Sequence, residues 1–155
     1  TDRPLNLRLD GRRVLAVEDQ PDMLESLRHV LEDRGARVTG VESGVEALAL
    51  LRAAPDDFDV LVSDIGMPHM DGYELIRHVR GELGLRPRRL AAVAITAYAR
   101  DEDRKRALRE GYQAHVVKPY HVGQLVAIIN DLLSAADEGP VATAQDPGRR
   151  PPIAL

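Results

Sequence analysis

The amino-acid sequence predicts an α/β domain of three layers, in which a parallel β-sheet is covered by helices on both faces. Short apolar runs alternate five times with longer segments whose apolar residues recur at helical spacing. Continuous apolar runs are typical of strands that are buried on both faces, as in a parallel sheet. The 155 residues, 44% of them hydrophobic and 30% charged, suffice for one such domain with a sizeable core.

The five expected strands are the apolar runs of the sequence. In chain order they cover residues 14–17, 37–41, 60–63, 91–95 and 115–117. The run at 37–41 is the weakest of the five. Each run is followed by a helical signal, so the chain contains five βα units in succession.

The first two helices are indicated by their spacing and by a start signal. After the first strand, Leu24, Leu27 and Leu31 recur at i, i+3 and i+7 and therefore share one helix face. Ser43 followed by Glu46 has the capping-box pattern, which predicts the start of a second helix. The apolar residues that we assign to this helix are Val45, Leu48 and Leu51.

The last three helices are expected at residues 72–80, at residues 101–110 and after the fifth strand. Asp71 precedes the third and is well placed to cap it by accepting backbone N–H bonds. We leave open whether the charged run at 101–106 is a solvated helix face or a surface that contacts a partner. The fifth helix carries apolar residues at i, i+3, i+4, i+7 and i+8, namely Leu125, Ile128, Ile129, Leu132 and Leu133.

The two ends of the sequence lack this regular pattern. We interpret residues 1–12 as a linker and residues 13–136 as the folded domain. Residues 137–155 are rich in proline, glycine and small residues without an apolar period, which predicts a disordered tail. Because the chain begins with Thr1 rather than methionine, we interpret it as a fragment of a longer protein.

Charge and composition argue against several classes of function. A formal net charge of -4 gives no general attraction to nucleic acid, which we do not expect as a direct partner. No apolar stretch approaches the ~20 residues that cross a bilayer, so we expect no membrane contact by this domain and a cytoplasmic location, with any membrane anchor elsewhere in the longer protein. Without cysteine the chain has no disulfide, thiol nucleophile or zinc-thiolate site.

Polar side chains stand at the ends of four different strands. Glu18 and Asp19 follow the first strand, Asp64 the third, Thr96 the fourth and Lys118 the fifth. Ligands of an open parallel sheet bind outside the carboxyl ends of the strands, where the strand order reverses. We therefore expect these five residues to converge on one site.

Three carboxylates in one place repel one another unless some bind protons or a cation lies among them. Oxygen ligands without histidine or cysteine favour a hard cation such as Mg²⁺, which together with one lysine balances three carboxylates. Such a site suits the transfer of a phosphoryl group with a carboxylate as nucleophile. Asp64, at the end of a buried strand, is the candidate for chemistry, and Asp71 is the candidate for a helix cap.

Four segments together carry a resemblance to a known family. VLAVEDQPD, VSDIGMPHMDGYEL, AITAYA and HVVKPY, in this order, resemble the receiver domain of two-component response regulators. The resemblance extends from about Arg13 to Ala136 and is specific because it joins four motifs. It implies a doubly wound, flavodoxin-like fold with five parallel strands in the order 2-1-3-4-5.

By this resemblance, Asp64 is the phosphoacceptor, which attacks a phosphohistidine on a partner histidine kinase or histidine phosphotransfer protein. The implied Mg²⁺ ligands are Asp19 and Asp64 directly, Gly66 through its backbone carbonyl and Glu18 through water. Lys118 is implied to pair with Asp64 and the phosphoryl group, and Thr96 to hydrogen-bond a phosphoryl oxygen as a switch. The isolated domain would catalyse only its own phosphorylation and dephosphorylation, so we do not class it as an enzyme.

Two residues depart from the family pattern. His115 stands three residues before the lysine, where the family usually has tyrosine or phenylalanine. We assign His115 to the switch and leave open the alternative of a solvated histidine. Gly66 lies two residues after the phosphoacceptor and has no side chain to steer the water that hydrolyses a phospho-aspartate.

The main alternative function is a pseudo-receiver, which is an interaction domain with this fold that is not phosphorylated. Such a domain should lack part of the acidic triad or the lysine, and this chain keeps them all. A haloacid-dehalogenase phosphatase would need a second acid where Gly66 stands, and an FMN carrier would need a phosphate loop in place of the acidic EDQPD. The segments IGMPHMDGYEL and GYQAHVVKP resemble those of receivers at the C-termini of hybrid sensor histidine kinases. As a further partner we allow for a second copy of the domain, in a weak homodimer.

Overall fold

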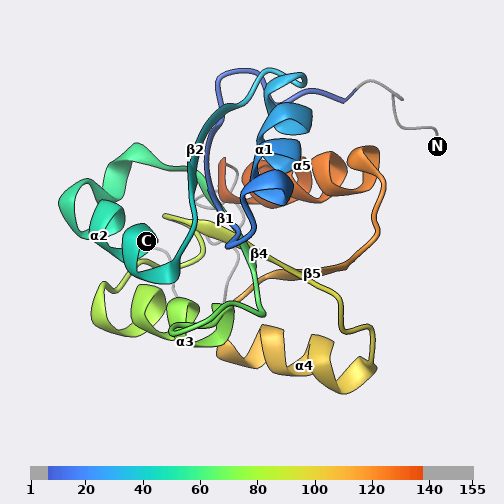
Figure 1. Ribbon diagram of the computed structural model, residues 1–155. Coiled ribbons are helices and arrows are strands. Elements are labelled where there is room, and N and C mark those ends of the chain that lie inside the picture. Colours follow the sequence, from blue (N-terminus) through green and yellow to red (C-terminus); the bar gives the residue numbers. More distant parts are fainter. Residues whose placement is uncertain (1–6, 138–155) are drawn as a thin grey trace, which may run out of the picture.

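The structure, a computed structural model, describes residues 7–137 of the chain. Five parallel strands form one sheet in the order β2-β1-β3-β4-β5. Helices α1 and α5 cover one face of the sheet, and α2, α3 and α4 cover the other (Figure 1). The predicted three-layer, flavodoxin-like fold and its strand order are confirmed.

Every predicted strand is present, and no strand end differs by more than one residue from its prediction. The strands are β1 (Arg13–Val17), β2 (Arg37–Val41), β3 (Val60–Asp64), β4 (Ala91–Thr96) and β5 (Ala114–Val117). The helices are α1 (Pro21–Glu32), α2 (Gly44–Ala53), α3 (Gly72–Arg77), α4 (Asp101–Glu110) and α5 (Val122–Asp137), with a short 3₁₀ turn at Pro55–Asp57 and a π-helical turn at His78–Glu82.

Alternate residues of the strands supply two separate cores. In β1, Leu15 and Val17 belong to the core on the α2 and α3 side, whereas Val14 and Ala16 belong to the core on the α1 and α5 side. Successive side chains of a strand point to opposite faces, and both faces of this sheet are covered. Polar side chains are therefore expected mainly at the strand ends, which is where the candidate site lies.

Helix α2 corrects one prediction from the sequence. Val45, which we assigned to its apolar residues, is 59% exposed. The buried residues are Gly44, Ala47, Leu48 and Leu51, at i, i+3, i+4 and i+7. Gly44 takes the inward position because its backbone lies against Met70, where an added Cβ would come within 2.9 Å of the sulfur. The start signal was right, since Ser43 Oγ accepts a hydrogen bond from the Glu46 N–H at 3.1 Å.

The third helix is shorter than predicted and changes type along its length. α3 ends at Arg77, and the chain continues in the π-helical turn His78–Glu82. The helix begins as expected, because Asp71 Oδ1 accepts a hydrogen bond from the Glu74 N–H at 2.9 Å. Asp71 therefore caps α3.

The segment before β1 takes part in the core. Leu9 is only 1% exposed, and its N–H donates to the carbonyl of Arg34. The described part of the expected linker thus packs on the domain, while residues 1–6 and the expected tail from 138 onward lie outside the described residues. Within residues 7–137, no helix is both long and apolar enough to cross a membrane.

Candidate functional site

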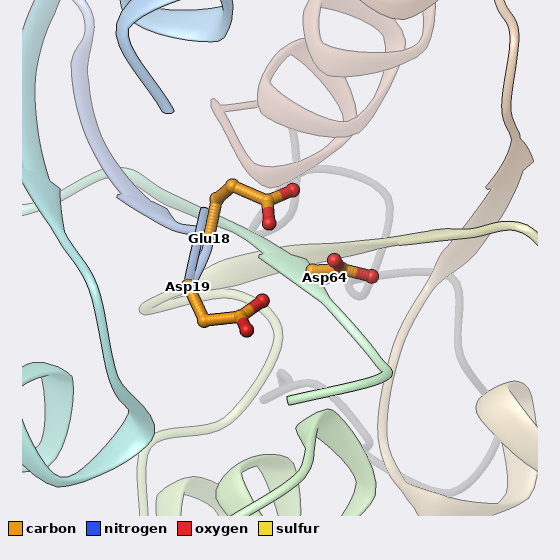
Figure 2. A group of neighbouring side chains, drawn as sticks. All are labelled: Glu18, Asp19 and Asp64. Carbon is orange, nitrogen blue, oxygen red and sulfur yellow. The ribbon is translucent and has the colours of Figure 1, made fainter. Parts of the chain in front are cut away.

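Three carboxylates meet at the carboxyl ends of two neighbouring strands. Glu18 and Asp19 directly follow β1, and Asp64 is the last residue of β3, which pairs with β1. One oxygen of each side chain lies within 4.8 Å of the others, and Figure 2 shows the three side chains as neighbours at the strand ends. The convergence that the sequence predicted for these acids is present.

Lys118 joins this cluster from the end of β5. Its Nζ lies 3.2 Å from Asp64 Oδ2 and 3.2 Å from Glu18 Oε1, and its backbone N–H donates to the carbonyl of Thr96. Burial acts to lower the pKa of Lys118, but the two carboxylates outweigh it and the pKa lies above its ordinary value. Lys118 is therefore a fixed positive charge, and the peptide bond to Pro119 is cis.

Glu18 and Asp19 differ in burial and in their partners. Glu18 is buried, and its Oε1 accepts from Lys118 while its Oε2 accepts from the Gln20 N–H at 3.1 Å. Burial raises the pKa of Glu18, and the charge of Asp64 raises it further. Asp19 is only partly buried, and within the described part of the chain it has no hydrogen bond or ion pair. Asp19 is thus the carboxylate with oxygens free for a new ligand.

The loops after β3 and β4 border the acidic cluster. The Gly66 N–H donates to Asp64 Oδ1 at 3.3 Å, and a Cβ added at Gly66 would meet no atom within 4 Å. Thr96 is buried, and its Oγ1 accepts from the Tyr98 N–H at 3.0 Å. Tyr98 itself is 61% exposed. Thr96 therefore stands at the edge of the site with its hydroxyl proton available to a further acceptor.

A cavity of about 440 Å³ opens beside the cluster, between α1 and the segment after β5. Glu18, Asp64 and Lys118 line its polar end, and Met23 and Tyr120 contribute apolar surface. Met23 is exposed in this structure. A reacting group on another molecule can therefore approach Asp64 from this side.

His115 lies in β5, away from the acidic cluster. Its Nε2 is buried without a hydrogen-bond partner within the described residues, although the residue as a whole is partly exposed. Burial lowers the pKa of His115, while Asp103 raises it and Arg104 lowers it to smaller extents. The ring is therefore held neutral more strongly than a solvated histidine would be.

We expect this lowered pKa to make stability depend on pH. The contribution of the neutral ring is complete above the ordinary value of 6.5 and is lost as the pH falls through the lowered pKa of the folded state. The melting temperature of the wild type should therefore fall more between about pH 7 and about pH 5 than that of His115→Gln. The matched control is His121→Gln, which replaces an exposed histidine and should behave as the wild type does. An equal fall in melting temperature in the wild type and in His115→Gln would contradict this account.

Two residues that bind the backbone next to the site were not recognised from the sequence. Ser63 and Tyr112 are both buried, and each donates its hydroxyl hydrogen to a backbone carbonyl near Asp64. For Ser63 a signal existed, because it is a polar residue in an otherwise apolar strand. For Tyr112 the sequence holds no such signal, since a buried tyrosine reads as an ordinary core residue. The ion pair of Lys118 with Glu18 was also not expected.

Comparison with known proteins identifies the family. The sequence model of the response regulator receiver domain matches residues 14–130, so the chain belongs to this family and is a receiver domain of two-component signalling. An uncharacterized 14.6 kDa protein of Leptolyngbya boryana is 47% identical over 117 residues, which cover 75% of this chain and 86% of that protein.

Two further relatives differ in how much of their length is matched. The sensor histidine kinase GacS of Pseudomonas protegens is 34% identical over 140 residues, which are 87% of this chain but 15% of the kinase. The chemotaxis protein CheY4 of Vibrio cholerae superposes with a TM-score of 0.71 at 29% identity, over 79% of this chain and 99% of that one. The chain thus resembles nearly all of one solved protein and a small part of a much longer kinase.

Proposed function

We propose that this domain accepts a phosphoryl group on Asp64 from a phosphohistidine of a histidine kinase or histidine phosphotransfer protein in the cytoplasm. The observation that carries the proposal is the position of Asp64, whose carboxylate lies 3.2 Å from Lys118 and in one cluster with the acidic pair after β1. Incubation with acetyl phosphate and Mg²⁺, followed by intact mass analysis, tests it.

In the transfer step, one carboxylate oxygen of Asp64 forms a bond to phosphorus while the phosphorus–nitrogen bond of the phosphohistidine breaks. The electron pair of that bond leaves with the imidazole nitrogen. The protein has little covalent chemistry to add, because phosphoryl transfer depends mainly on positioning and on neutralisation of the oxygens. Lys118 supplies one such positive charge, at 3.2 Å from Asp64.

The acidic cluster fits a hard divalent cation such as Mg²⁺. Its side-chain donors are all carboxylate oxygens, and one lysine leaves the three carboxylates with an excess of two negative charges. Asp19, whose oxygens have no partner in the described residues, and Asp64 would hold the ion directly, with the backbone carbonyl of Gly66, while Glu18 would act through water, as the family resemblance implies. The ion would neutralise charge on the phosphoryl oxygens.

The switch is proposed to begin at Thr96. Its Oγ1 accepts a bond from the Tyr98 N–H, so its hydroxyl proton can be donated to an oxygen of the phosphoryl group. A shift of Thr96 toward Asp64 would then move the loop that carries Tyr98. His115 is the second switch residue in this proposal, because its buried Nε2 has no partner in the described part of the chain and is free to acquire one.

Gly66 provides a prediction about the lifetime of the phosphorylated form. Gly66→Asn should speed hydrolysis of the phospho-aspartate about three- to tenfold, because an amide side chain can hydrogen-bond and orient the attacking water. Open space around Gly66 allows the substitution without a clash. The decay of phosphorylated protein, followed by mass analysis, gives the rate. Gly66→Ala, which adds a Cβ but no hydrogen-bonding group, is the control, and an equal change in both variants would refute the explanation.

The alternative function, that of a pseudo-receiver, predicts the opposite results. It predicts no phosphorylation by acetyl phosphate and no dependence of partner binding on Asp64. The geometry favours the phospho-accepting function, since Asp64, Asp19, Glu18 and Lys118 are all present and adjacent. A chain kept only for interaction has no need of three crowded carboxylates, which are costly to hold together.

A further inference from the structure

Two buried hydroxyl groups bind the backbone of the loop that begins at Asp64. Ser63 is fully buried, and its Oγ donates to the carbonyl oxygen of Asp64 at 2.9 Å. Tyr112, in the turn between α4 and β5, is 3% exposed, and its hydroxyl donates to the carbonyl oxygen of Gly72 at 2.7 Å. Both hydroxyls thus bind backbone carbonyls at the two ends of the loop that follows β3.

These two ends are in direct contact with each other. The Gly72 N–H donates to the carbonyl of Ile65 at 2.8 Å, which closes the loop. A Cβ on Gly72 would lie 2.6 Å from the carbonyl oxygen of Asp64 and 2.8 Å from the Cα of Ile65, so only glycine permits this approach. The position of Gly72 therefore fixes the backbone at Asp64, and with it the loop that carries Gly66.

The two hydroxyls also lie near each other. Burial raises the pKa of Tyr112 well above its ordinary value, and the nearby hydroxyl of Ser63 acts in the opposite direction. A buried hydroxyl without a partner costs free energy, whereas a fully paired network in an apolar core favours a single arrangement of its members. Here the two hydroxyls are paired with the backbone carbonyl oxygens of Asp64 and Gly72.

We propose that Ser63 and Tyr112 are positioning residues, which hold the two ends of the loop from Asp64 to Gly72 in place and so set how well the acidic cluster binds a divalent cation. The positioning of the loop is a property of the metal-free domain alone. The effect on cation binding rests on the proposed function, because it assumes that the cluster holds Mg²⁺.

The decisive variant is Tyr112→Phe, which removes one hydroxyl and keeps the ring in the core. Tyr73→Phe is the matched control, because Tyr73 is buried in the same core but its hydroxyl has no hydrogen bond within the described residues. In metal-free protein, amide exchange at Gly72 and Met67 should become up to about tenfold faster in Tyr112→Phe, the factor that one net hydrogen bond supports, while Val62 in β3 stays as in the wild type.

Titration with Mg²⁺ gives the second readout. We expect Tyr112→Phe to weaken Mg²⁺ binding about three- to tenfold at a temperature where both proteins are folded, and Tyr73→Phe to change it less than twofold. Ser63→Ala should act in the same direction, and the double variant should lose less than the sum of the single losses. Unchanged amide exchange in Tyr112→Phe, or equal effects of Tyr112→Phe and Tyr73→Phe, would overturn the assignment. Absence of Mg²⁺ binding in the wild type would instead overturn the proposed function, and amide exchange would still decide whether Tyr112 positions the loop.

Discussion

Replacement of Asp64 by asparagine is expected to abolish phosphorylation by acetyl phosphate, with a loss of at least about a hundredfold in yield or rate. An amide nitrogen or oxygen is a poor nucleophile, and the only other carboxylate of the described residues that pairs with Lys118 is that of Glu18, which is more deeply buried than Asp64 (4% against 9% exposed). Intact mass analysis after incubation with acetyl phosphate and Mg²⁺ measures the effect, and peptide mapping locates the modified residue.

The matched control is Asp71→Asn, seven residues further along the same loop. Asp71 caps α3 through one oxygen, and asparagine is an equally good N-cap, so this variant should fold and accept phosphate like the wild type. Phosphorylation that survives in Asp64→Asn, or that is lost in Asp71→Asn, would refute the assignment of Asp64.

Misfolding should not confuse this comparison. Asparagine at position 64 keeps an oxygen that can accept the bond from the Gly66 N–H, and it removes one of three carboxylates that repel one another. We therefore expect the metal-free Asp64→Asn protein to melt at the same temperature as the wild type or higher. A large fall in melting temperature would mean that loss of the ion pair with Lys118 destabilises the fold more than the weaker repulsion among the carboxylates stabilises it.

The parts of the fold that the sequence predicted well are those set by local pattern. The apolar runs located all five strands, because both faces of the sheet are covered and most strand positions between the ends are apolar. The strand order followed only from the family resemblance, since spacing along the chain does not say which strands pair. Asp71 was recognised as a cap because capping is decided within a few residues of the helix start.

The failures arise where distant contacts decide. Val45 fits the period of α2 as well as Gly44 does, but in the structure Gly44 lies against Met70 and Val45 is exposed. The same holds for Leu9, which is buried by contacts with the α1 side of the sheet although its own segment has no pattern. Neither contact can be read from neighbouring residues in the sequence.

The candidate site shows the same division. Its first layer, the strand-end acids and the lysine, was predicted because the carboxyl ends of parallel strands meet at one edge. The ion pair between Lys118 and Glu18 and the hydrogen bond from Tyr112 to Gly72 were not predicted. The paired residues lie 100 and 40 positions apart in the sequence, respectively. Side-chain direction across such separations is a property of packing and not of sequence pattern.

The second large effect that we expect concerns the two acids after β1. Asp19→Asn should weaken Mg²⁺ binding by on the order of thirtyfold, and Glu18→Gln by less than about tenfold. Both variants remove one negative charge from the same cluster, so charge alone predicts similar losses. The difference comes from the oxygens, since those of Glu18 already accept bonds from Lys118 and Gln20 whereas those of Asp19 have no partner in the described part of the chain.

Calorimetric titration of Mg²⁺ into each protein measures these losses, and Asp22→Asn serves as the control for charge at a distance. Asp22 is exposed in the first turn of α1 and lies outside the cluster, so its loss should change the affinity less than twofold in solutions of moderate ionic strength. Equal losses for Asp19→Asn and Glu18→Gln would show that the cation is held by the summed charge of the cluster and not by direct bonds to Asp19. A greater loss of affinity for Glu18→Gln would mean that the ion pair between Lys118 and Glu18 breaks when the cation binds, and that Glu18 is then the direct ligand.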